Sequence, residues 1–397
     1  MNKYFSRVSQ YLLLFAVLSS YSIWIFGNNP TFPAFFYFQG NQVMLGLVTL
    51  VLLLNIHKWK WSDWAVIGIA IATGLYSTAV SGIKYADTPE LNFVIPLILL
   101  MIECYRICPF NKVEKGILLG IQVGAVLLTM IRLVIELPKV IDLQAILEFD
   151  NTLTSLWINV NAIGASILVS VMLSTILIKS YGNRWWNLMV LPIYMLGLIG
   201  TWACQSQTSL AILLVFIFID NCLPKMIFQK MKVWLLSFFI IFIGTPFMAH
   251  GFAESTTIDI FTGRETIWHD FFSIWLTKTE YILNGLGVFV NYKGLSTHNS
   301  YLYTLSNYGI IGYILLFGTL SFFIFTLLKQ ASRLTKTQVS LLFAFLLLCV
   351  YTMMEDTFLV ASWMPVIYIF LGLALAESRE IEIKQAILEK EETELKG

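Results

Sequence analysis

The stretch AIGASILVSVMLSTILI, residues 162–178, carries no charged side chain, and uncharged apolar runs also occupy residues 91–102, 116–131 and 233–247. Of the 397 residues, 12% are charged and 58% are hydrophobic, and the mean hydropathy is +0.76. Ordinary soluble domains are about 25% charged and 45–50% apolar. A single soluble core cannot hide this much apolar surface, so the bilayer is expected to be the solvent of the chain.

Apolar windows of about 20 residues, the length that crosses a bilayer as a helix, predict twelve transmembrane helices. They are expected at residues 10–26, 42–56, 64–80, 91–103, 116–137, 157–178, 186–203, 208–221, 233–250, 301–328, 338–354 and 357–376. The sequence therefore predicts an all-α polytopic membrane protein with a single transmembrane domain over residues 1–376. Residues 377–397, with seven Glu against four Lys or Arg, form a charged cytoplasmic tail in this prediction. This tail and the net charge of +1 argue against a nucleic-acid partner.

The distribution of Lys and Arg orients the predicted helices, because short cytoplasmic loops are rich in these residues. With a cytoplasmic N-terminus, fifteen Lys and Arg fall on segments that face inward and six on segments that face outward. Both termini are therefore expected in the cytoplasm. The longest connection, residues 251–300 between the ninth and tenth helices, is expected outside it, and a loop of that length usually has a function.

This extracytoplasmic loop contains a predicted amphipathic helix. Thr262 and Glu265 have the spacing of a capping box, and apolar residues follow at helical spacing from Ile267 to Trp275. We expect the helix to lie in the outer membrane interface with its aromatic face in lipid.

Two residues of the loop are the main candidates for chemistry. Arg264 falls in the first turn of the predicted helix, where free backbone N–H groups attract anions, so it suits a phosphate-bearing ligand. His298 stands at the start of the tenth helix, a position that favours the neutral imidazole that a general base needs. The simpler alternatives are an arginine at the membrane surface and a histidine that ends a loop.

Other polar residues at outer helix ends are weaker candidates. Arg132 lies in the fifth helix, four residues before Glu136, and an intramembrane arginine normally faces a cavity or a partner; the alternative is an ion pair with Glu136. Gln205 lies in the polar turn before the eighth helix and Glu355 in the last outer turn, and either could simply connect helices.

The five cysteines lie within or beside apolar segments and are expected to be structural. Cys104 and Cys108 are four residues apart, as two metal ligands could be, but no second pair or histidine lies nearby in sequence. The sequence therefore predicts no metal site.

A series of residues in the loop follows a recognisable order: Gly263-Arg264, Trp268, Gly285-Leu286-Gly287, His298-Asn299-Ser300-Tyr301, Gly309 and Gly312. This order resembles the signature region of O-antigen ligases and Wzy-type polysaccharide polymerases. Weaker similarities are residues 159–164, Ser206 and Glu355. Where many relatives carry an arginine directly after the serine ahead of the eighth helix, this chain has Gln207.

The resemblance implies a GT-C-like glycosyltransferase of the bacterial plasma membrane with an extracytoplasmic active site. It implies transfer of a whole glycan from undecaprenyl diphosphate to the hydroxyl of a glycan or glycolipid acceptor, without metal, cofactor or nucleotide sugar. In that scheme Arg264 binds the diphosphate and His298 activates or positions the acceptor hydroxyl. The residues expected to bind substrate are Arg132, Asn299, Tyr301, Gln205 and Glu355. The partners implied are the lipid-linked donor, the acceptor, membrane lipids and, optionally, a chain-length regulator.

Polymerisation of surface-polysaccharide repeat units is the favoured reaction, with ligation of finished polymer to lipid A-core or another acceptor as the alternative. A transporter or lipid-linked oligosaccharide flippase would also have about twelve helices, but such proteins commonly show two related halves and midplane binding residues. Here the halves do not match and the polar residues gather at one surface. A cell-wall polymerase acting on lipid II would lack the His-Asn signature.

Overall fold

The computed structural model describes residues 2–26, 40–84, 93–136, 160–182, 184–223, 230–255, 263–286, 297–329 and 331–396. These residues form helices and turns and no strand. The first half contains α1 (Asn2–Phe26), α3 (Gly40–Leu54), α4 (Trp61–Lys84), α5 (Val94–Ile107), α6 (Lys112–Glu136) and α8 (Val160–Ser180). The second contains α9 (Arg184–Leu188), α10 (Val190–Ala203), α11 (Gln207–Cys222), α12 (Met231–Ala253), α13 (Arg264–Trp275), α14 (Thr279–Asn284), α15 (Ser300–Leu328), α16 (Lys336–Tyr351), α17 (Met364–Ile367) and α18 (Ile369–Lys396).

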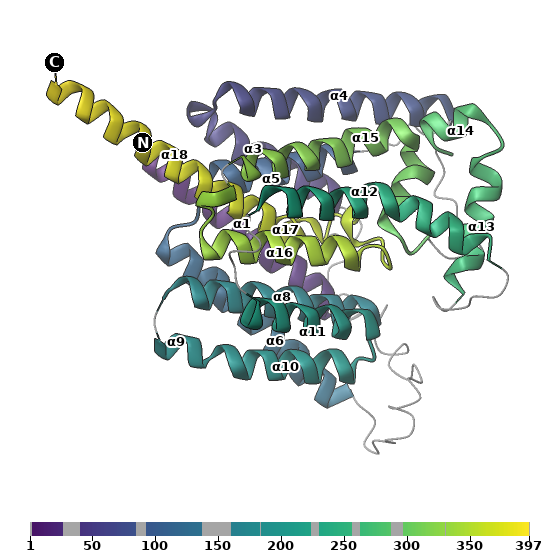
Figure 1. The fold of residues 1–397 in the computed structure, drawn as a ribbon, viewed down its shortest axis with the longest axis horizontal. Helices are drawn as coiled ribbons and strands as arrows, with labels where there is room; N and C mark the ends of the chain where they lie inside the picture. The colour runs from purple at the N-terminus through teal and green to yellow at the C-terminus, as the bar shows by residue number, and fades with distance from the viewer. Residues whose placement is uncertain are drawn as a thin grey trace.

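The described parts of the twelve predicted apolar segments fall largely on helices, and the structure is a polytopic bundle of apolar helices that suit a membrane (Figure 1). Among the described residues, seven helical segments are long and apolar enough to cross a bilayer. These are Tyr4–Phe26, Trp61–Val80, Lys112–Ile135, Asn161–Ser180, Trp185–Ala203, Met231–Ala253 and Ser300–Leu328. The count of twelve crossings stays a prediction.

The last predicted helix, residues 357–376, differs from the structure. It is divided into a 3₁₀ turn at Thr357–Leu359, the short helix α17 and the first part of α18. Pro365 lies in the first turn of α17, where its missing N–H costs nothing. Helix α18 then continues without a break through the charged tail to Lys396, so the tail is helical.

The helix ends meet at two opposite ends of the bundle. The loop end carries α13 and α14, and the tail end is where α18 leaves the bundle (Figure 1). At the loop end, Asn161 Nδ2 of α8 donates to Glu355 Oε1 at 2.8 Å, and Tyr76 OH of α4 donates to Asn284 Oδ1 at 3.1 Å. At the tail end, Arg379 Nη2 of α18 donates to the Lys58 carbonyl at 2.6 Å. These bonds connect α8 and α4 to the loop end and α18 to the turn before α4 at the tail end. The alternation of all twelve predicted crossings, and which end faces the cytoplasm, stay predictions.

Helix α8 is the centre of the bundle. Every residue from 163 to 178 is buried, because α6, α10, α11, α16 and α1 pack around it. A helix that is apolar on all sides suits such a position. Its N-terminal end, at Asn161, therefore reaches the loop end from the middle of the protein.

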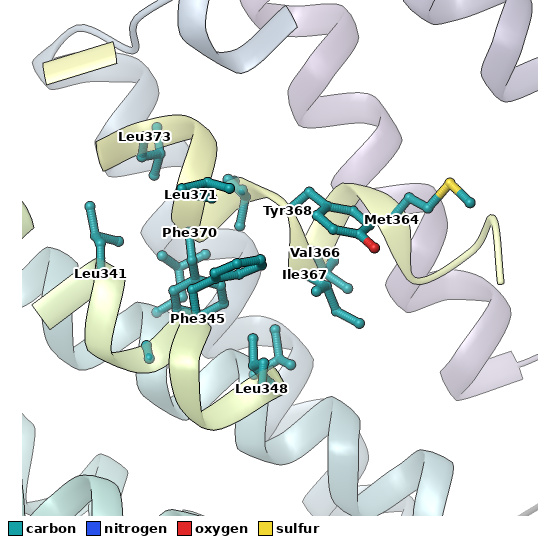
Figure 2. Packing of buried hydrophobic residues seen from close by; sticks show 14 of the residues in the cluster. Leu341, Phe345, Leu348, Met364, Val366, Ile367, Tyr368, Phe370, Leu371 and Leu373 are labelled. Atoms are coloured by element: carbon teal, nitrogen blue, oxygen red, sulfur yellow. The ribbon is translucent and has the colours of Figure 1, made fainter. Parts of the chain in front are cut away.

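A second packing layer joins α16 to α17 and α18. Figure 2 shows Phe345 of α16 close to Tyr368 and Phe370, with Leu341 and Leu348 on the same helix. The Phe345 and Tyr368 ring centroids are 6.3 Å apart, within the range of favourable aromatic pairs. This layer fixes the turn between α16 and α17, which contains Glu355, on the bundle.

Large apolar side chains also cover the outside of the bundle. Several are more than half exposed, among them Leu75, Leu191, Leu236, Phe247 and Ile314. An exposed apolar surface of this extent is incompatible with water as the surrounding solvent but suits lipid. The surface therefore supports the membrane assignment independently of helix length.

Candidate functional site

The start of α15 is tied to the turn after α16. Asn299 is the N-cap of α15, and its side chain accepts from the N–H groups of Tyr301 and Leu302 at 2.9 and 3.1 Å. The Asn299 N–H donates to Asp356 Oδ1 at 2.7 Å, and Ser300 Oγ donates to the Glu355 carbonyl at 2.8 Å. These bonds place residues 297–300 directly against Glu355 and Asp356.

His298 occupies a left-handed backbone conformation within this junction, with φ of +48°. For a residue with a side chain this costs about 1 kcal/mol, and such strain concentrates at functional sites. The conformation is held from both sides, because Trp268 Nε1 donates to the Thr297 carbonyl at 3.0 Å and Asp356 binds the Asn299 N–H. The His298 side chain is 24% exposed, so it can meet a ligand.

Arg264 is presented by the first turn of α13, as predicted. Gly263 is the N-cap and adopts φ of +82°, a left-handed conformation that glycine takes at little cost. Thr262, the expected partner in a capping box with Glu265, lies outside the described residues. The chain therefore turns at Gly263, and Arg264 is the first residue of α13.

The aromatic face of α13 corrects one expectation. Ile267, Trp268, Phe271, Phe272 and Trp275 are buried within the protein, against α12 and the start of α15, instead of in lipid. Amphipathicity shows that one face of a helix seeks an apolar phase, but it does not say whether that phase is lipid or protein. The consequence is that Arg264 stands on a helix fixed to the bundle.

The segment after α13 packs by backbone against α15. Gly285, with φ of +75°, has no room for a Cβ, which would lie 2.6 Å from the Asn307 carbonyl carbon. Gly309, with φ of +62°, would meet the Leu283 carbonyl oxygen at 2.2 Å. Both glycines are thus required by the close approach of α14 to a kink in α15; Gly287 lies outside the described residues.

Glu355 is the point where the predicted candidates meet. Its Oε1 lies 3.1 Å from Arg264 Nη2, and its Oε2 lies 3.7 Å from His298 Nδ1. The carboxylate is largely enclosed, with a side-chain exposure of 9%, and that of Arg264 is 15%. Residues from three separate segments therefore form one charged cluster at the loop end.

Behind Glu355 lies a polar layer that the sequence did not assign to the site. Asn161 Nδ2 donates to Glu355 Oε1 at 2.8 Å, and Ser206 Oγ lies 3.3 Å from Asn161 Oδ1 and 2.8 Å from Ser209 Oγ. Gly164 permits this contact, because a Cβ there would lie 2.3 Å from Ser206 Cβ. The sequence signals for this layer were polar residues at the starts of two apolar helices and the weaker family similarities at residues 159–164 and Ser206.

Gln205 immediately precedes this layer. Its backbone is left-handed, with φ of +57°, in the tight turn between α10 and α11. Its Oε1 atom is buried without a hydrogen bond among the described residues. Gln205 therefore lies beside the layer that supports Glu355, and its contact with substrate stays a prediction.

Two of the expected substrate-binding residues have structural roles instead. Tyr301 has no exposed surface, and its hydroxyl donates to the Cys349 carbonyl at 2.9 Å. Asn299 is 1% exposed, and its side chain caps α15. Direct contact with substrate is therefore incorrect for both in this structure: Tyr301 anchors α15 to α16, and Asn299 positions His298.

Arg132 and two further histidines near the loop, His250 and His269, lie on α6, α12 and α13. Arg132 is half-buried on α6, which packs on α1, α8 and α10, and its role stays a prediction. His269 is exposed, with Nδ1 3.9 Å from Glu254 Oε1, and the His250 ring contacts Phe272. Of the three loop-region histidines, His298 is the one brought to Arg264 and Glu355.

The cluster combines groups with different chemical capacities. A guanidinium has five N–H donors, and the bond to Glu355 uses Nη2 of Arg264, so other donors can bind an anion. The imidazole of His298 can take up a proton, and Glu355 can orient both groups. Comparison of the chain with known protein families, with curated proteins and with solved structures finds no match.

Proposed function

We propose that this protein is an extracytoplasmic glycosyltransferase of the bacterial plasma membrane. It moves a glycan en bloc from undecaprenyl diphosphate to a sugar hydroxyl and so polymerises surface-polysaccharide repeat units. The observation that carries the proposal is the convergence of Arg264 and His298 on Glu355 at the loop end.

The donor diphosphate binds at Arg264. Arg264 is the first residue of helix α13, so the backbone N–H groups of the first turn add to the attraction of its guanidinium for an anion. A diphosphate leaves easily when its developing charge is neutralised, which an arginine does best in an enclosed site. The small exposure of Arg264 provides that enclosure.

His298 acts on the acceptor. The acceptor hydroxyl oxygen attacks the anomeric carbon of the donor glycan, and the bond from that carbon to the diphosphate oxygen breaks. The hydroxyl proton passes to His298, and undecaprenyl diphosphate leaves. Glu355 positions both residues, since its two oxygens face the guanidinium and the imidazole. Enclosed groups held in place in this way stabilise a transition state without reorganising.

The proposal is tested by the surface and lipid-linked polysaccharide of a strain that lacks this chain. The strain is complemented with wild type, Arg264→Ala, His298→Ala or the control His269→Ala, whose imidazole is 54% exposed and lies outside the cluster. Polymerase activity predicts that the first two variants leave acceptors with at most one repeat, whereas the control restores long chains.

Two outcomes contradict the proposal or change it. Long chains with both Arg264→Ala and His298→Ala, at matched protein levels, would exclude the proposed site. Full-length polymer that accumulates on the lipid carrier and never reaches its final acceptor would replace polymerase by ligase, with the same donor chemistry and the same residues.

A further inference from the structure

A second charged cluster lies at the tail end, away from the proposed active site. A cavity of about 130 Å³ opens there between the first turns of α4, the last turns of α5 and α15, and residues 375–382 of α18. Its polar lining includes Lys60, Arg106 and Arg379, and its apolar wall includes Phe322, Phe323 and Leu375. The tail end is the end at which α18 leaves the bundle (Figure 1).

The two arginines are held in place by buried carboxylates. Arg106 pairs with Asp63 and with Glu103, whose Oε1 lies 2.8 Å from Arg106 Nη2. Arg379 Nη2 lies 3.0 Å from Asp63 Oδ2. The Asp63 and Glu103 side chains have no exposed surface and do not line the cavity, which therefore faces the guanidiniums and not their counterions.

More basic than acidic side chains line the cavity, although Asp63 and Glu103 pair with the two guanidiniums from behind. Lys60, Arg106 and Arg379 line it together with one carboxylate, Glu382. Lys60 Nζ is 3.8 Å from Glu382 Oε2, and both side chains are about half exposed, so this pair is weak and separable. An anion that enters the cavity would meet two pre-positioned guanidiniums and the half-exposed ammonium group of Lys60.

The surroundings of the cavity belong to a membrane surface. Trp61, at the start of α4, is 88% exposed and Trp64 is 50% exposed, and tryptophans gather where lipid headgroups begin. Phe322 is also 50% exposed and continues the apolar wall along α15. Acyl chains can therefore follow the helices while a headgroup occupies the cavity.

We propose that this cavity binds the phosphate of an anionic phospholipid from the leaflet at the tail end, which the sequence predicts to be cytoplasmic. Arg106 and Arg379 bind the phosphate, Lys60 closes over it, and the acyl chains lie along Phe322 and Phe323. Because Arg379 belongs to α18, the bound lipid also holds this helix against α4 and α5. The proposal is independent of the glycosyltransferase function.

Native mass spectrometry of the purified full-length protein, titrated with phosphatidylglycerol or phosphatidylcholine, tests the site. Wild type is expected to bind phosphatidylglycerol more tightly than phosphatidylcholine. Lys60→Glu is expected to weaken phosphatidylglycerol binding by about fivefold or more, since one basic residue near an anionic headgroup contributes about that factor. Thr326→Trp, which fills the cavity but replaces no residue of the ion pairs, should also weaken phosphatidylglycerol binding. Lys336→Glu is the control, because Lys336 is exposed but does not line the cavity.

Equal binding of the two lipids by wild type would overturn the proposal, as would unchanged phosphatidylglycerol binding in both cavity variants. Competition with excess inorganic phosphate shows whether the cavity binds a phospholipid headgroup or a free phosphate ion. The lipid is expected to stay bound, because the apolar wall contributes to its affinity; full displacement would assign the site to a soluble phosphate and reject the lipid.

Discussion

Glu355→Gln tests whether the carboxylate organises the proposed active site. The side chain keeps its shape but loses its charge, while Oε1 in the native protein accepts from Asn161 at 2.8 Å and from Arg264 at 3.1 Å. A hydrogen bond to a charged group contributes about 1.5–3 kcal/mol net. The Arg264 and Glu355 side chains are largely enclosed, with exposures of 15% and 9%, so solvent screening reduces this contribution little. Since 1.36 kcal/mol is a factor of ten, kcat/KM should fall about ten- to hundredfold.

The assay is the initial rate of glycan transfer in proteoliposomes at low donor concentration. Glu254→Gln is the matched control, because Glu254 also faces a histidine, at 3.9 Å from His269, but is 59% exposed. The control should stay within about twofold of wild type, as exposed pairs contribute little. A rate for Glu355→Gln within the same range, at equal protein levels, would refute the organising role of the carboxylate.

Three further changes test the structure around the two clusters. Gly164→Ala should lower the thermal unfolding midpoint, because its Cβ meets Ser206 at 2.3 Å and overpacking costs about 1–3 kcal/mol, whereas Gly46→Ala, with no atom within 4 Å, should not. Asn299→Ala should cost about 1 kcal/mol of stability by removing an N-cap and should slow transfer; Asn299→Asp should restore the midpoint. Asp63→Asn should cost about 3–5 kcal/mol in the same melting assay, since it removes the carboxylate that pairs with Arg379 and leaves Arg106 with Glu103 alone.

Much of the fold follows from hydropathy alone. A helix that crosses lipid must satisfy its own backbone, so long uncharged runs have few alternatives, and the predicted segments are helical in the structure. The outer turn at Glu355 was predicted, but the division of residues 357–376 into a 3₁₀ turn, α17 and α18 was hidden, because this segment is apolar whether or not the helix is broken. Hydropathy likewise could not show that the aromatic face of α13 meets α12 instead of lipid.

The candidate site was predictable only in part. Arg264 and His298 stood out through their positions at helix starts, and both occupy those positions in the structure. The bridge through Glu355 could not be derived, because it joins residues 91 apart in sequence and depends on tertiary packing. Tyr301 shared a motif with His298, but motif membership does not separate a residue that touches a ligand from one that holds the backbone.

The most direct test of the central claim uses purified protein in proteoliposomes with an undecaprenyl-diphosphate-linked glycan and its acceptor, without any other protein. Mass spectrometry follows the extended glycan and the released undecaprenyl diphosphate. The account predicts that wild type forms both products, and that Arg264→Ala and His298→Ala, folded and inserted, form neither. Equal product formation by wild type and both variants would contradict it.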